Sequence, residues 1–226
     1  MTARKFRIVT AAAGAPITVD EVKAHARVDG STDDTILGEF IDAAVEVCEA
    51  FTRRRVFMQR TVEELWDDAP SYSGDVTLRL VPPVAIAQVA TYADDGTETV
   101  FSSANYALDP YSNRGHLYLR DAASAWPTVS STSGRNRNGF AVRYVAGYGA
   151  SGDDVATQRA AVPEAIRRAV AMTAAHLYEN REGQGAEAVM EFGATGGNRA
   201  PIDALPPGAR LALAPYVVHD LRDLDA

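Results

Sequence analysis

The chain has 226 residues, of which 46% are hydrophobic and 23% are charged, and its net charge is −8. This composition is ordinary for a globular protein, and the acidic balance argues against a protein that grips nucleic acid by neutralising phosphates. No apolar run approaches the ~20 residues that span a bilayer, and no apolar stretch follows the basic N-terminal residues. We therefore expect neither a membrane segment nor a signal peptide, and we expect the protein to be made and kept in the cytoplasm.

Two segments in the first quarter of the chain have the pattern of amphipathic helices. Thr18 and Glu21 have the spacing of a capping box, and the apolar Ile17 and Val22 are placed to form a hydrophobic staple. This predicts a first helix that ends near residue 28, before Asp-Gly. A second, longer helix is predicted from residues 31–34 to 55, because apolar residues recur there with helical spacing.

From residue 56 the pattern changes to short segments of β character separated by turn residues. An Asp-Gly turn at residues 94–97 favours a hairpin, and the proline pair at 82–83 is expected to end a strand. A polar loop is predicted over 130–139 and a second loop over 149–158. Regularly spaced short strands favour a small antiparallel barrel or sandwich. The predicted strands cover residues 61–66, 75–80, 87–92, 99–101, 106–109, 116–119 and 141–145.

The last part of the chain is a helix followed by a tail of different composition. Pro163 lies where the first turn of a helix tolerates a missing N–H, and the helix is predicted to reach about Arg181. The tail is rich in glycine, alanine and proline, with a short helix expected over residues 207–216. Because it holds few bulky apolar residues, we expect this tail to be disordered or to order on binding a partner.

Together these elements predict an α+β fold. It comprises a small helical bundle, with two N-terminal helices plus one C-terminal helix, an inserted antiparallel β barrel or sandwich, and an extended C-terminal tail. The predicted organisation is an N-terminal arm (1–16), a helical connector core (17–58 and 160–182), a β-rich insertion (59–148), and a flexible tail with a short helix (183–226).

Residues that carry chemistry are few and scattered. Cys48 is the only cysteine, which excludes an intrachain disulfide, and its apolar surroundings predict a buried side chain. The sequence has no nucleophile-elbow or phosphate-loop pattern. The histidines are too far apart in sequence for a helical metal site, and they are His25, His116, His176 and His219. We therefore predict no catalytic residues, no metal ligands and no cofactor.

Taken in order, several motifs resemble the head–tail connector, or adaptor, proteins of tailed phages and gene transfer agents. These motifs are ITVDEVKAHARVD at 17–29, LRLVPPV at 78–84, VAGYG at 145–149 and VPEAIRRAV at 162–170. The resemblance spans about residues 15–182, and it depends on the order and spacing of motifs that are individually weak. The chain departs from the family in its long β region and its long tail.

The resemblance implies a structural, non-enzymatic subunit of a dodecameric ring beneath the portal protein. Such a ring joins the DNA-filled head to a stopper or tail terminator protein. Double-stranded DNA passes through its channel without specific binding. The implied location is the host cytoplasm during assembly and then the head–tail interface of a virion or phage-like particle.

Two sets of residues are candidates for contacts with these partners. The first set, in the tail, is expected to order when it docks on the portal: Arg199, Pro201, Leu205, Pro206, Pro207, Arg210, Leu211 and Leu213. The second set is expected at subunit contacts or the channel: Arg53, Arg54, Arg55, Arg135 and Arg137. For Arg53 to Arg55, charges that complement the helix dipole remain an alternative, and for Arg135 and Arg137 a solvated hairpin tip does.

Two other functions remain open at the level of sequence. A β-sandwich binding module of a virion, for carbohydrate or protein, predicts an exposed groove of aromatic residues such as Trp66 and Trp126. A small hydrolase predicts a concave pocket in which His176 lies beside a carboxylate.

Overall fold

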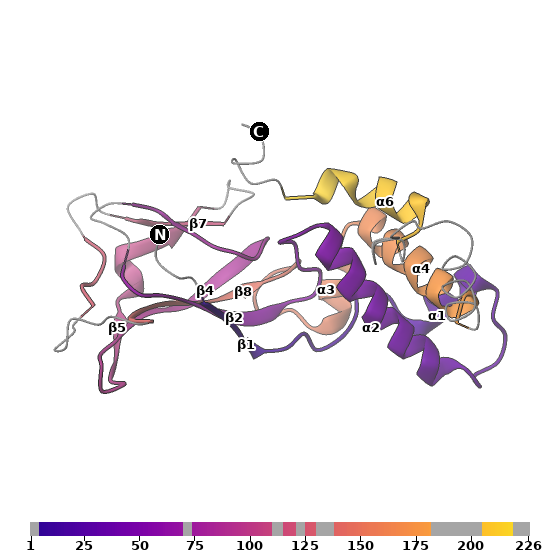
Figure 1. Cartoon of the computed structure of the whole chain (residues 1–226), viewed down its shortest axis with the longest axis horizontal. Helices are drawn as coiled ribbons and strands as arrows, with labels where there is room; N and C mark the ends of the chain where they lie inside the picture. Colours follow the sequence, from indigo (N-terminus) through magenta and orange to yellow (C-terminus); the bar gives the residue numbers. More distant parts are fainter. Residues whose placement is uncertain are drawn as a thin grey trace, which may run out of the picture. The chain divides into compact units, whose positions relative to one another are not determined.

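The computed structural model describes residues 5–69, 74–109, 115–120, 125–129, 138–181 and 205–218. The chain divides into two compact units, and each unit is built from two separate segments (Figure 1). The β unit comprises residues 1–13 and 58–158, and the helical unit comprises residues 14–57 and 159–226. The predicted α+β class is confirmed, with the β-rich segment inserted between the second helix and the C-terminal helices.

Two antiparallel sheets make up the β unit. The larger sheet has the order β1-β2-β8-β4-β5, with β1 (Lys5–Thr10), β2 (Arg60–Trp66), β4 (Pro83–Tyr92), β5 (Glu98–Phe101) and β8 (Phe140–Ala146). The smaller sheet has the order β3-β7-β6, with β3 (Val76–Thr77), β6 (Tyr106–Leu108), β7 (His116–Leu119), and the 3-10 helix η1 (Ser103–Asn105) before β6. Within the described residues the sheets share no strand. They therefore form a sandwich-like arrangement, not a closed barrel.

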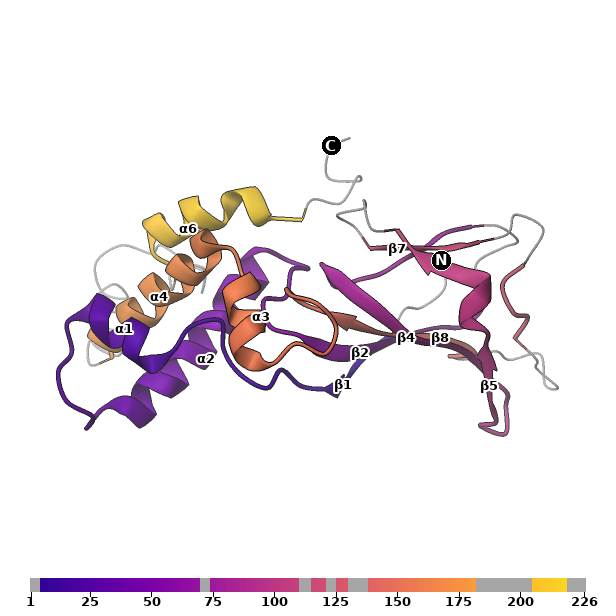
Figure 2. The ribbon, with the colours of Figure 1, turned by 180° about the vertical axis from the view of Figure 1, so that it is seen from behind.

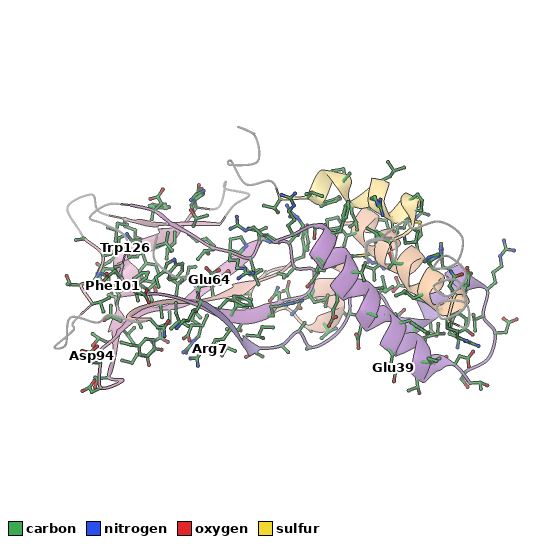
Figure 3. All side chains as sticks on the ribbon, in the orientation of Figure 1. Arg7, Glu39, Glu64, Asp94, Phe101 and Trp126 are labelled. Atoms are coloured by element: carbon green, nitrogen blue, oxygen red, sulfur yellow. The ribbon has the colours of Figure 1, made fainter. Side chains whose placement is uncertain are left out.

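One face of the larger sheet carries the core of the β unit. Tyr144 and Glu64 are fully buried on this face, and the Tyr144 hydroxyl donates to Glu64 Oε1 at 2.5 Å. The backbone N–H of Leu80, in the segment after β3, donates to the Tyr144 oxygen at 2.9 Å. Figure 3 shows Phe101 and Trp126 close together at one end of this unit, where their ring centroids are 6.2 Å apart. Satisfied polar groups and stacked rings thus join the sheet to the segments that cover it.

The helical unit contains α1 (Val19–Ala26), α2 (Asp34–Phe51), α4 (Glu164–Glu179), α6 (Pro207–Leu213) and the 3-10 turn η3 (Ala214–Tyr216). A further helix, α3 (Val155–Ala161), contains the boundary between the two units. Helix α2 buries Leu37, Ile41, Ala44 and Cys48, which recur at helical spacing, and α4 buries Ile166, Ala169, Val170 and Thr173. The Cys48 sulfur lies 3.6 Å from the Thr173 hydroxyl, so the predicted burial of Cys48 is confirmed.

The predicted capping box at the start of α1 is confirmed. The Glu21 backbone N–H donates to the Thr18 hydroxyl at 3.2 Å, and the Thr18 backbone N–H donates to Glu21 Oε2 at 2.6 Å. The same carboxylate group accepts from Arg167 of α4, which also bonds Glu164 at 3.3 Å. One acidic residue therefore caps α1 and ties it to α4.

The start of α2 is held by two further contacts within the helical unit. Lys23 of α1 forms an ion pair with Asp34 at 2.8 Å. The Tyr178 hydroxyl of α4 donates to Asp33, and the Tyr178 ring packs edge-on against Phe40 with centroids 6.2 Å apart. The three helices are thus joined by polar contacts at their ends as well as by apolar packing between them.

The structure differs from the sequence-based expectations at several boundaries. Residues 5–10, within the predicted N-terminal arm, form the edge strand β1. Pro83 begins β4, although the proline pair was expected to end a strand; the first position of a strand tolerates a missing N–H. The predicted loop over 149–158 contains the start of α3. The first of these differences depends on distant strand pairing and the second on a proline at a strand end, whereas the start of α3 has a local contact, in which the Thr157 backbone N–H donates to Asp154 Oδ1 at 2.7 Å.

Adjacent residues of α2 allow a matched test of the helical core. Leu37 is 0% exposed and Ile36 is 36% exposed. We expect Leu37→Ala to lower the free energy of unfolding by ~3 kcal/mol, because it leaves a cavity. Ile36→Ala should cost less than ~1 kcal/mol, because its side chain is partly solvated. Denaturant unfolding followed by helical circular dichroism measures both, and equal losses would contradict this account of the core.

Candidate functional site

The residues with possible reactivity lie in environments that do not favour catalysis. In the described parts of the chain, no three histidine, cysteine or carboxylate side chains gather as metal ligands would. Burial raises the pKa of the Cys48 thiol to about 11, although its hydrogen bond with Thr173 opposes the change. His176 Nδ1 lies 3.0 Å from the Asn180 amide nitrogen, and no ion pair between His176 and a described carboxylate is formed. The exposed surfaces are candidates for contact with partners.

Helix α6 is the first of these surfaces. It lies along α4 in both views, as the yellow helix beside the orange one (Figures 1 and 2). Its inward side chains Ala209 and Leu213 are 0% exposed, and Leu205 just before it is 2% exposed. On its outward side Arg210 is exposed and Leu211 is 77% exposed. Leu211 is the most exposed large apolar side chain in the described parts of the chain.

The predicted portal-docking set is thus divided by the structure. Leu205 and Leu213 face the helical unit itself, while Pro207, Arg210 and Leu211 face outward and Pro206 is half-buried. Arg199 and Pro201 lie outside the described residues. The tail was expected to order only on a partner, but α6 has a partner within the chain. The apolar side chains at 205, 209 and 213 recur every fourth residue, so they lie on one face and are buried together. The low overall content of bulky apolar residues in the tail does not reveal this spacing.

The Arg53–Arg55 segment lies beyond the helix it was expected to close. Helix α2 ends at Phe51, and Arg53 adopts a left-handed backbone conformation with φ 69°. Arg55 Nε donates to the carbonyl of Tyr216 at 3.0 Å, and its guanidinium lies 5.8 Å from the Tyr216 ring centroid. The structure therefore uses Arg55 to anchor the C-terminal segment of the same chain.

This anchoring contact has a backbone component and was not predicted from the sequence. The Val218 backbone N–H donates to the carbonyl of Thr52 at 3.2 Å. A contact between residues so far apart leaves no local pattern in the sequence. Arg135 and Arg137, the other predicted contact residues, lie outside the described residues.

A row of polar side chains crosses one face of the larger sheet, with one member on each strand. We call it the polar row, and it comprises Arg7 (β1), Glu63 (β2), Arg143 (β8), Gln88 (β4) and Glu98 (β5). Arg7 Nε donates to Glu63 Oε2 at 2.5 Å, and the Arg143 guanidinium donates to Glu63 Oε1 at 2.8 Å. Arg143 also donates to Gln88 Oε1 at 3.2 Å, and Gln88 Nε2 donates to Glu98 Oε1 at 2.9 Å. The row begins with a cation on one edge strand and ends with a carboxylate on the other.

Glu63 is the central member of the polar row and the most buried. Its side chain is 1% exposed, whereas that of Arg7 is 61% exposed and that of Arg143 is 29% exposed. Burial by itself raises the pKa of Glu63, but the hydrogen bonds from Arg7 and Arg143 outweigh it, so that the pKa is lowered overall. The carboxylate is therefore held in its charged form between two guanidinium groups.

Several of the aromatic residues named for a binding module lie in the core of the β unit. Trp126 is 5% exposed, Tyr106 is 6% exposed and Phe140 is 0% exposed, whereas Trp66 is half-buried. Trp126 Nε1 donates to the carbonyl of Gly74 at 2.8 Å, and the Trp126 ring meets the Phe140 ring edge-on. Trp126 therefore does not contribute to an exposed aromatic groove.

The described residues thus have an α+β fold, in which an antiparallel sandwich is inserted between helices of a helical unit. Residues 16–107 match the family described as phage gp6-like head-tail connector protein. This match confirms the resemblance to head–tail connectors that the motifs predict. The matched residues include α1, α2 and the strands β2 to β5, and over them the chain is similar to that family.

Solved structures show the same fold over nearly the whole chain. Among them is a chain from the "Neck of empty GTA particle computed with C6 symmetry", with a TM-score of 0.69 and 22% identity over 96% of this chain and 97% of that chain. Another comes from the "Virion of native gene transfer agent (GTA) particle", with a TM-score of 0.67, 23% identity and the same coverage of both chains. A third, from the "Neck of native GTA particle computed with C12 symmetry", has a TM-score of 0.65, 22% identity and again the same coverage. No curated protein sequence matches the chain.

Among the described residues, no helix has both the length and the apolar character that a bilayer crossing requires.

The lowered pKa of Glu63 gives a prediction for the acid stability of the β unit. Its contribution to stability should be fully present above the unfolded pKa, near 4.5, and should be lost as the pH falls through the lower folded pKa. At pH 7, Glu63→Gln should cost ~2 kcal/mol, because it removes charged hydrogen bonds. That difference from the unmutated protein should shrink below about pH 4.

Thermal unfolding between pH 2.5 and 7 measures this difference. Glu39→Gln, on the exposed surface of α2, is the matched control and should leave the unfolding curve unchanged at pH 7. A pH-independent loss in Glu63→Gln would show that the carboxylate has no part in acid stability.

Proposed function

We propose that this chain is a structural adaptor subunit at a head–tail junction. Several copies form a ring beneath the portal, the ring surrounds the DNA channel, and it joins the head to a stopper or tail terminator protein. The observation that carries the proposal is the agreement of two comparisons. The family model covers the first helices and strands, and the likeness to gene transfer agent necks covers 96% of the chain.

The physical properties of the chain support this role. A net charge of −8 does not suit a protein that holds DNA through phosphates, but it suits a ring through which DNA passes. The described residues offer no assembled metal site, and the thiol is buried and protonated. The likeness to head–tail connectors and particle necks supports a structural role, without catalysis or a cofactor. In this proposal the subunit is made in the host cytoplasm and ends in the particle.

The exposed face of α6 is the part of the predicted docking segment that supports contact with the portal. The Leu211 side chain is 77% exposed, so it can bind a partner without disturbing the helical unit. Because α6 already packs against α4, binding to the portal does not have to offset the full loss of conformational entropy on ordering this helix. The docking surface is thus partly preorganised.

Electron microscopy of particles tests the ring directly. We expect density for this chain to encircle the channel beside the portal, in a closed ring with cyclic symmetry. Gold or tag labelling at the N-terminus identifies the chain within the particle. Labels elsewhere in the virion, with an unrelated protein beside the portal, would contradict the proposed function.

Two variants of α6 test the docking surface separately from folding. We expect Leu211→Ser to leave the unfolding temperature nearly unchanged, because this side chain is exposed. The same variant should reduce incorporation into portal-bearing heads, because it removes an apolar contact. Incorporation is measured by sedimentation of heads followed by immunoblotting.

The matched control is Leu213→Ala, on the buried face of the same helix. It should lower the stability of the helical unit by ~3 kcal/mol, because it leaves a cavity. It should leave the outward face intact. Normal incorporation of the Leu211→Ser variant would overturn the assignment of portal docking to this face.

A further inference from the structure

The two edge strands of the larger sheet lack a partner on their outer sides among the described residues. Strand β1 pairs only with β2, and strand β5 pairs only with β4. Both strands expose apolar side chains: Ile8 is 51% exposed, Val9 is 44% exposed and Val100 is 59% exposed. An edge with free backbone groups and exposed apolar side chains is a template for a further strand.

The charges on these two edges are of opposite sign. Strand β1 carries Lys5 and Arg7, which are both exposed and point to the same face of the sheet as the polar row. Strand β5 carries Glu98, and the turn before it exposes Asp94 and Asp95. Figure 3 labels Arg7 on β1 and Asp94 at the turn between β4 and β5. One edge is therefore basic and the other acidic.

This asymmetry distinguishes between the ways in which two copies can join their sheets. A two-fold contact of β1 with β1 brings Lys5 and Arg7 beside their own copies. A two-fold contact of β5 with β5 brings Glu98 beside its own copy. Both contacts place like charges together, which disfavours them. A head-to-tail contact of β5 with β1 of the next copy places unlike charges together, and a heterologous contact of this kind forms a ring when the rotation between copies closes.

The strand directions and registers are compatible with the head-to-tail contact. All neighbouring strands in the larger sheet are antiparallel, so β1 and β5 run in the same direction. One row across the sheet joins Lys5, Leu65, Ala141, Ala90 and Val100 through successive pairings. If the next copy adds its β1 beside β5 in the same register, so that this row continues across the contact, Lys5 of the next copy lies beside Val100.

We propose that β5 of one copy pairs in parallel with β1 of the next copy, so that the larger sheets join edge to edge around the ring. Glu98 lies two residues from Val100 on the same face of β5, within reach of the neighbour's Lys5 in this arrangement. The polar row of one copy then continues into that of the next with a carboxylate meeting a cation. This inference rests on the proposed function for the existence of the ring, and it adds which surfaces meet within it.

Charged side chains on edge strands also protect sheets from unwanted pairing. Lysine and arginine on β1 alone would fit that role. With acidic residues on the opposite edge, like charges meet only in the two-fold contacts, which are disfavoured. In the head-to-tail contact unlike charges meet, which favours it. A second copy of this chain is therefore the occupant that fits both edges.

Disulfide cross-linking tests the proposed pairing. Neighbouring strands lie ~4.8 Å apart, and a disulfide joins residues whose Cα atoms are about 4.4–6.8 Å apart. Lys5→Cys combined with Val100→Cys should therefore give a ladder of covalent oligomers after mild oxidation of assembled particles. Either single variant should give none. The natural Cys48 is 0% exposed and does not compete.

Two controls accompany the cross-linking. Val100→Cys with Tyr118→Cys keeps an exposed pair, but it moves one cysteine to β7, the central strand of the other sheet, and it should give no ladder. In the double-cysteine background, Glu98→Lys should reduce cross-linking about two- to five-fold, because it replaces an attraction by a repulsion. Circular dichroism verifies that each variant is folded.

The outcomes separate this inference from the proposed function. A ladder in the Lys5→Cys, Val100→Cys variant, and not in the controls, supports the edge-to-edge contact. Dimers from a single variant would overturn it in favour of a two-fold contact. No cross-linking in particles where microscopy shows the ring would overturn it while leaving the adaptor role intact. Absence of the ring itself would overturn both.

Discussion

The antiparallel pairing of β2 with β8 is the constraint on which the rest of the fold depends. These strands are the first and last of the inserted segment, and they pair from Arg60 opposite Ala146 to Trp66 opposite Phe140. The insertion therefore begins and ends at neighbouring points. Gly147 makes the closure possible: a Cβ atom there would lie 2.6 Å from Gln59 Cα, and φ is 140°. Gln59 Nε2 then donates to the carbonyls of Tyr148 and Ala150, each at 2.9 Å.

Because the insertion closes on itself, the helical unit can be assembled from segments more than a hundred residues apart. Its centre is the packing of α2 on α4, where Cys48 meets Thr173, and the Arg167–Glu21 contact joins α4 to α1. The family match ends at residue 107, within the β unit, although the fold likeness continues over nearly all of the chain. Sandwich positions are specified mainly by alternation of apolar and polar residues, so the fold persists where sequence identity is low.

The sequence predicted the parts of the fold that are set by local signals. The Thr18 capping box, the helical periodicity of α2 and the burial of Cys48 are all local or periodic, and each was found. Strand β1 was missed because its order comes from β2, which is some fifty residues away. Two further features were missed: the contact of Arg55 with Tyr216, and the polar row around Glu63. Both join residues that are distant in sequence, so no local spacing pattern predicts them.

The edge strands β1 and β5 are far apart in sequence, so their opposite charges can be related to each other only once the order of the strands in the folded sheet is known. The bulge between Ile8 and Thr10 interrupts β1, so its regular part runs from Lys5 to Ile8, and β5 spans only Glu98–Phe101. Pairing over so short a length provides few hydrogen bonds, and an isolated contact between two copies is therefore weak. In a closed ring each copy is held at both edges, and the contacts reinforce one another through effective concentration. Short, oppositely charged edges thus suit a subunit that stays separate until a surrounding structure gathers its copies.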